Sequence, residues 1–178
     1  MKKNLFRSLM VFVILLSGCK LIDKLTQFNV DYSTDFTIPS TVLLGLPLDI
    51  VPSAVTTNSD QTFSNNNTSA DHIKEVQLSK LKLTITSPSG KKFDFLKSAI
   101  IYISADGLPK VEVASIDNID GSTVGSSIDL TPTAQDLKAY LIKSSYTISE
   151  TVTTSKSLTE NVNVRADAEF FVQGKLLK

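Results

Sequence analysis

Residues 161–172 read NVNVRADAEFFV, and this stretch decides the fold. Its even-numbered residues, from Val162 to Val172, are all apolar, while its odd-numbered residues are polar or charged from Asn161 to Glu169. Successive side chains of a β-strand point to opposite faces, so this alternation predicts a strand with one buried and one solvated face. Strands of that kind are typical of antiparallel sheets.

The same alternation occurs at two other places along the chain. In residues 28–38 the apolar set includes Phe28 and Ile38, and Pro39 then ends the strand because it has no amide hydrogen to donate. In residues 76–85 the apolar phase slips by one near Ser79-Lys80, which predicts a β-bulge.

Turn signals separate the remaining predicted strands. Asp106-Gly107 lies between apolar runs and predicts a hairpin. Residues 42–51 are rich in leucine and suggest another strand, made irregular by Gly45 and Pro47. Residues 53–72 are mostly Ser, Thr, Asn and Asp, and we expect an exposed loop there. A binding loop is the less favoured alternative, since function concentrates in loops on rigid scaffolds.

One short helix is predicted after Pro132. Thr133 and Asp136 have the spacing of a capping box, and Leu137, Tyr140 and Leu141 then share one helical face. We expect about two turns that close one end of the fold.

Together these patterns predict an all-β fold, an antiparallel β-sandwich of immunoglobulin-like general architecture with one short helix. About eight strands would form a single domain over residues 27–178. We expect residues 28–38 and 161–172 to be the longest strands. The expected core includes Phe28, Val30, Leu83, Ile101, Val164 and Phe170.

The composition limits the range of functions. The 178 residues include 18 basic and 18 acidic ones. Three of the basic residues lie within residues 1–18, so the rest of the chain has 15 basic and 18 acidic residues and a formal charge of −3. This charge balance disfavours nucleic acid as a partner, because proteins that bind nucleic acid carry a stripe of basic residues. No glycine-rich phosphate loop is present, so no cofactor is predicted.

The amino-terminal segment has three successive parts. Lys2, Lys3 and Arg7 precede an apolar run over residues 9–16, and Leu16-Ser17-Gly18-Cys19 follows. The run is too short for a transmembrane helix, which needs about 20 residues. An ordinary secretory signal is the closer alternative, but it would leave Cys19, the only cysteine, as an unpaired thiol.

This segment resembles the signal peptide of bacterial lipoproteins, and Leu16-Ser17-Gly18-Cys19 is similar to a lipobox. The resemblance implies that residues 1–18 are a signal peptide, which is cleaved before Cys19. It also implies diacylglycerol on the sulfur of Cys19 and a further acyl chain, such as palmitate, on its amino group. Residues 19–26 would then be a lipidated tether. Lys20, in place of the Asp that retains lipoproteins in the inner membrane, implies the outer membrane. An acidic run for surface export is missing after Cys19, which favours the periplasmic leaflet. The body resembles small, uncharacterised β-sandwich lipoproteins of outer membranes, a likeness of pattern that supplies no functional residue.

Few residues suggest chemistry. His72 is the only histidine and lies in the polar stretch, where neither a zinc site nor a Ser-His-Asp site is favoured. Residues 117–121 read DNIDG, but Ile119 occupies a position where a calcium loop needs an oxygen ligand, so a turn is favoured. The four tyrosines fall in or beside apolar sets, which disfavours an exposed platform for carbohydrate.

Two hypotheses for the function remain. The first is a membrane-anchored, non-catalytic binding or structural module of the cell envelope, with an envelope protein or a glycan as its partner. The second is an envelope hydrolase acting on a glycan through a carboxylate pair such as Asp117 and Asp120. The sequence favours the first, because no nucleophile, base and stabilising group are brought together by any pattern in it. Cys19 is then the one functional residue, as the lipid attachment site, and no catalytic, cofactor-binding or metal-binding residue is assigned.

Overall fold

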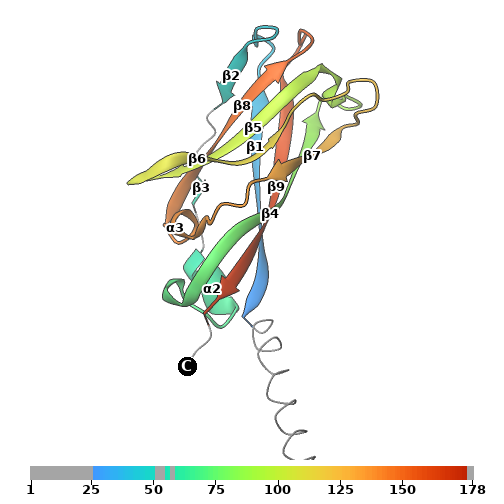
Figure 1. Ribbon diagram of the computed structural model, residues 1–178. Coiled ribbons are helices and arrows are strands. Elements are labelled where there is room, and N and C mark those ends of the chain that lie inside the picture. Colours follow the sequence, from blue (N-terminus) through green and yellow to red (C-terminus); the bar gives the residue numbers. More distant parts are fainter. Residues whose placement is uncertain (1–25, 51–54, 57–58, 176–178) are drawn as a thin grey trace, which may run out of the picture.

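The computed structural model describes residues 26–50, 55–56 and 59–175 (Figure 1). The predictions for the signal peptide, for Cys19 and for residues 20–25 therefore lie outside the described residues. Within them nine strands form antiparallel pairs. The strands are β1 (Gln27–Ile38), β2 (Pro47–Ile50), β3 (Val55–Thr56), β4 (Ile73–Ser87), β5 (Leu96–Ala105), β6 (Leu108–Ile116), β7 (Ser127–Pro132), β8 (Ser145–Thr154) and β9 (Val162–Gly174).

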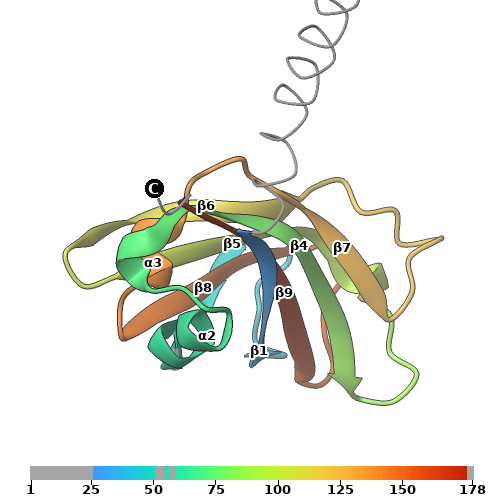
Figure 2. The same ribbon diagram turned by 90° about the horizontal axis from the view of Figure 1, so that it is seen from below.

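The strands pack as two layers joined through β7. The order along the sheet is β1-β9-β4-β7-β6-β5-β8-β2, with β3 also paired to β8. Strand β7 pairs with β4 through residues 127–130 and with β6 through residues 131–132, so the sheet curls around its core (Figure 2). The predicted all-β antiparallel sandwich is confirmed.

The longest strand is β4, with 15 residues, followed by β9 with 13 and β1 with 12. The expectation that residues 28–38 and 161–172 form the longest strands is therefore wrong. Register shifts interrupt the pairing of β4 with β9 at three places, and each shift breaks the period-two pattern from which a strand's length is predicted. The shift between Leu78 and Lys80 is the predicted bulge.

Four of the six expected core residues are buried, namely Leu83, Ile101, Val164 and Phe170. Phe28 and Val30 are only half-buried and pack against the core from its margin. They lie at the beginning of β1, a strand that ends the sheet order and pairs with β9 alone. The predicted hairpin at Asp106-Gly107 joins β5 to β6, and Gly107 has the positive φ of 73° that favours glycine.

The predicted helix is α3 (Lys138–Leu141), which buries Tyr140 and Leu141. It is shorter than expected, and its capping box is absent. The Asp136 carboxylate accepts hydrogen bonds from the amides of Lys138 (2.9 Å) and Val76 (3.0 Å), which attaches the helix to β4. The Thr133 hydroxyl instead donates to the Glu112 carbonyl at 3.2 Å.

The prediction of an exposed loop over residues 53–72 is wrong in the part that the structure describes. Helix α2 (Ser59–Asn65) and the short 3₁₀ helix η1 (Ala70–His72) lie there, and a second 3₁₀ helix, η2 (Phe93–Phe95), lies before β5. Phe63, the single aromatic residue of α2, is buried in the core with 3% of its surface exposed. One buried ring thus orders a segment whose other residues are polar.

Candidate functional site

The most unusual surface of the domain is the connection between β1 and β2. We call residues 39–46, of sequence PSTVLLGL, the leucine loop. Leu43, Leu44 and Leu46 are 66%, 57% and 55% exposed. In the described part of the chain only one other large hydrophobic residue is exposed, Ile142. A single exposed leucine is ordinary, but three within four residues concentrate exposed apolar surface in one loop, and such a concentration is typical of interaction sites.

Hydrogen bonds hold the backbone of the leucine loop in place. The Val42 amide donates to the Pro39 carbonyl and the Leu46 amide to the Leu43 carbonyl, both at 3.2 Å, which forms two successive turns. The Gly45 amide donates to the Thr154 carbonyl of β8 at 2.9 Å. The three leucines are therefore presented by an ordered backbone.

Two residues determine the backbone path of this loop. Pro39 ends the ladder of β1, and Gly45 has a φ of +73°, a conformation that other residues rarely adopt. Val42 takes the single inward position and is buried. The Ser40 amide donates to the Asn161 side-chain oxygen at 2.9 Å, which fixes the start of the loop to the β8–β9 connection.

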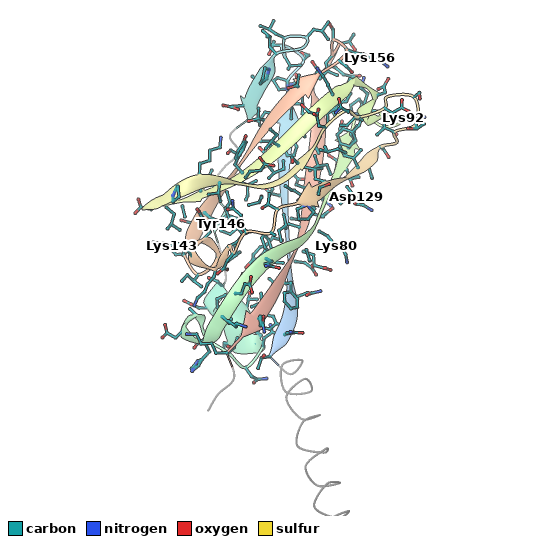
Figure 3. All side chains as sticks on the ribbon, in the orientation of Figure 1. Lys80, Lys92, Asp129, Lys143, Tyr146 and Lys156 are labelled. Carbon is teal, nitrogen blue, oxygen red and sulfur yellow. The ribbon has the colours of Figure 1, made fainter. Side chains whose placement is uncertain are left out.

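The leucine loop lies at the end of the domain farthest from the start of β1 (Figure 1). Strand β1 carries the chain there over 12 residues, or about 40 Å at ~3.3 Å per residue. The chain has no charged residue between Asp35 and Asp49. Lys156 lies at the same end (Figure 3) and is paired with Asp94, Nζ to Oδ2 at 2.8 Å. The leucines thus form an apolar tip on the far end of the domain.

The residues that the sequence singled out for chemistry are exposed and locally bonded. Asp117 accepts a hydrogen bond from the Asn118 amide, and Asp120 accepts from the amide and hydroxyl of Ser122. These bonds hold the pKa of Asp120 below its usual range. Both carboxylates therefore shape a turn, as predicted, and no described contact joins the two.

His72 and the tyrosines also occupy ordinary positions. The His72 ring lies in the exposed η1 segment, with its Nδ1 2.8 Å from the Ser69 hydroxyl. Tyr140 and Tyr146 are buried, and the half-buried Tyr102 is covered by the Lys110 ammonium, 4.3 Å from the centre of its ring. Among the described residues no three His, Cys, Asp or Glu side chains gather as metal ligands would. No helix in the same residues is long and apolar enough to cross a membrane.

Sequence reasoning missed two features. The leucine-rich composition of residues 42–51 predicts an irregular strand there, and the structure instead has a loop up to Leu46, for which Gly45 and Pro47 are the signals in the sequence. Glu150 of β8 was not singled out at all. It is completely buried, and neither of its carboxyl oxygens has a hydrogen-bond partner in the described structure. Burial raises its pKa to about 8.

No protein-family model and no curated protein matches this sequence. Among solved structures the chain is similar to proteins of three plant viruses. The protein of turnip yellow mosaic virus has 9% sequence identity to this chain; the match covers 84% of this chain and 96% of the viral one, with a TM-score of 0.25. Desmodium yellow mottle tymovirus is 11% identical over 85% of each chain, with a TM-score of 0.21. Cocksfoot mottle virus is 8% identical over 85% and 86%, with a TM-score of 0.25. Similarity this low indicates neither a shared fold nor a shared function.

Proposed function

We propose that the chain is a non-catalytic binding module of the cell envelope, anchored to the outer membrane through lipid on Cys19, which docks the leucine loop into an apolar pocket of a partner protein. The observation that carries the docking is the exposure of Leu43, Leu44 and Leu46 on an ordered loop. Burying one fully exposed leucine side chain contributes about 1.5–3 kcal/mol, and each of these leucines, 55–66% exposed, would contribute about half to two thirds of that. An ordered loop loses little conformational freedom on binding, so more of this gain remains as affinity.

The shape and charge of the loop favour a protein pocket over other occupants. Segments that bind membrane surfaces carry Lys or Arg beside their apolar residues, and none lies between Asp35 and Asp49. Lys156, at the same end of the domain, is paired with Asp94. A second copy of this chain offers a poor receptor. The apolar cavity between its layers measures about 40 Å³, while ligand pockets begin at about 300 Å³.

The anchor and the loop fit together in one arrangement. In the sequence, residues 19–26 directly precede β1, and β1 ends where the leucine loop begins. A lipid on Cys19 would therefore hold one end of the domain near the membrane and present the leucines at the other. The alternative of a glycan hydrolase has less support, because Asp117 and Asp120 are exposed and engaged in local turn bonds.

Photocrosslinking in the native cells tests this function. A photoreactive amino acid at Leu44 should give a discrete adduct with a different protein, and Leu43→Ser with Leu46→Ser in the same chain should abolish that adduct. Both leucines are already in water, so the double variant should keep the thermal midpoint of the parent protein. The matched control is the photoreactive residue at the exposed Asp129, midway along the domain (Figure 3), which should give no such adduct.

Three outcomes would contradict the proposal. One is an adduct at Leu44 that persists in the double serine variant. The others are adducts at Leu44 with lipid only, or with a second copy of the chain only.

A further inference from the structure

A hollow of about 580 Å³ lies beside α2 and the start of β1, at the end of the domain opposite the leucine loop (Figure 1). We call it the polar hollow, because most of its described lining residues are polar. Three segments distant in sequence line it. The first is the start of β1, with Phe28. The second runs from the end of α2 to η1, with Ser64, Asn67, Thr68 and His72, and the third is the end of β9, with Lys175. Its volume falls within the range of about 300–1,000 Å³ typical of small-molecule sites.

Two backbone hydrogen bonds join the segments that line this hollow. The Gly174 amide donates to the Thr26 carbonyl at 2.8 Å, and the Lys175 amide donates to the His72 carbonyl at 2.6 Å. Glycine at position 174 favours this close approach, since a Cβ there would lie 3.2 Å from the Thr26 oxygen and 3.3 Å from its Cβ, both tighter than ordinary contacts. The start of β1, η1 and the end of β9 are thus joined into one fixed rim.

The polar groups around the hollow suit a ligand rich in hydroxyls. Ser64, Asn67 and Thr68 supply hydroxyl and amide groups, which both donate and accept hydrogen bonds, as each sugar hydroxyl does. The half-buried ring of Phe28 gives an apolar wall suited to the C–H face of a sugar ring. No carboxylate is among the described lining residues.

An anionic ligand fits the hollow less well. The Lys175 ammonium donates to the Asp71 carbonyl at 2.8 Å, and the Nδ1 of His72 lies 2.8 Å from the Ser69 hydroxyl. The end of α2 that adjoins the hollow is its carboxyl end, where the helix dipole disfavours negative charge. None of the described lining residues is an arginine, although arginine is the usual bidentate partner of phosphate.

We propose that the polar hollow is a saccharide-binding site, separate from the leucine loop. Asn67 and Thr68 hydrogen-bond the sugar hydroxyls, and Phe28 contacts the face of the ring. This assignment does not depend on the function proposed for the leucine loop, because the two sites lie at opposite ends of the domain (Figure 1).

Nitrogen-15 NMR of the full chain in detergent tests the assignment. The probes are N,N′-diacetylchitobiose, cellobiose and maltose, each titrated to well above a Kd of about 1 mM. We expect saturable shifts of the Asn67 side-chain amide signals with at least one disaccharide. The double variant with Leu43→Ser and Leu46→Ser should bind the same sugar equally well, which separates this site from the proposed docking site.

Asn67 and Asn118 offer a matched pair of substitutions. Both have a φ of 54°, so glycine removes either amide side chain without backbone strain. Asn67→Gly should weaken saccharide binding by about fivefold or more, the effect of losing one or two hydrogen bonds, while Asn118→Gly should leave it unchanged. Thr68→Val, which removes a hydroxyl at nearly constant shape, should weaken binding as well and provides a second variant if Asn67→Gly alters the fold.

Several results would overturn the assignment. The first is that no disaccharide of the three shifts the Asn67 side-chain amide signals in a saturable way. The second is that the Asn67→Gly and Thr68→Val variants bind the sugar as well as the parent protein does. The third is that inorganic phosphate, and no sugar, saturates the site.

Discussion

Glu150 of β8 lies directly opposite Ile101 of β5, and its side chain points into the apolar core between the layers. Tyr146 and Val152, on the same face of β8, are buried with it. No part of Glu150 is exposed, and in the described structure neither carboxyl oxygen is hydrogen-bonded. Burial without a partner disfavours the charged form, so the carboxyl holds its proton at neutral pH, with a pKa of about 8.

This burial predicts a stability that falls as the pH rises. The unfolded chain releases the Glu150 proton near the ordinary value of 4.5, while the folded chain keeps it up to about pH 8. Between these values the folded state binds more protons, so the free energy of unfolding decreases with pH, by up to about 1.4 kcal/mol per pH unit. Urea denaturation at pH 5, 6, 7 and 8 measures this slope.

Glu150→Leu should remove the slope and raise the stability at pH 8. The control is Glu160→Leu, an exposed carboxylate in the β8–β9 connection, which should leave the slope in place. A parent protein whose stability is constant or rises from pH 5 to pH 8 would show that Glu150 is not buried as a neutral acid.

Phe170 is the second test of the core. Its ring is buried and packs edge-on against Tyr32, with the ring centres 5.8 Å apart, so it joins β9 to β1. Phe170→Ala should lower the free energy of unfolding by about 3–5 kcal/mol, through lost burial and the cavity that remains. Phe171→Ala, at the half-exposed neighbour on the opposite face, should cost much less in the same denaturation experiment. Equal losses would mean that the faces of β9 are wrongly assigned.

The fold was predictable where one pattern continues without interruption. Strands β1 and β9 pair in unbroken register, and each keeps a period of two, so both could be located from sequence. Helix α2 could not, because its residues are polar except Phe63, and tertiary burial of one ring outweighs the local composition.

The candidate sites were less predictable for a different physical reason. Periodicity identifies which side chains face inward, but it assumes that apolar residues are the ones that do so. Leu43, Leu44 and Leu46 break that assumption by facing water, and Glu150 breaks it by facing the core. The polar hollow depends on three segments that meet only in the folded chain, and no local pattern encodes that meeting.

Asn161 provides a test of the ordered presentation of the leucines. Its side-chain oxygen accepts the Ser40 amide at the start of the leucine loop. Asn161→Ala removes this bond, worth about 0.5–1.5 kcal/mol, while every leucine remains. We expect faster hydrogen exchange of the Ser40 amide and a weaker photocrosslink from Leu44. Asn163→Ala, whose side chain bonds Thr37 within the sheet, is the control and should preserve the crosslink. An undiminished crosslink in Asn161→Ala would show that order in the loop does not contribute to docking.

The last prediction concerns the anchor. Cys19 is the only cysteine of the chain, so no other thiol can accept a lipid. Each buried methylene contributes about 0.8 kcal/mol to membrane attachment, and one chain alone holds weakly, so two or three chains are needed for lasting attachment. Cells fed a clickable palmitate should label the parent protein and place it in the membrane fraction. Cys19→Ala should lose the label entirely, whereas Ser17→Ala, which keeps a small residue in the lipobox-like stretch, should retain it. A labelled Cys19→Ala chain, or an unlabelled parent protein, would exclude lipid attachment at this residue and with it the anchored half of the proposed function.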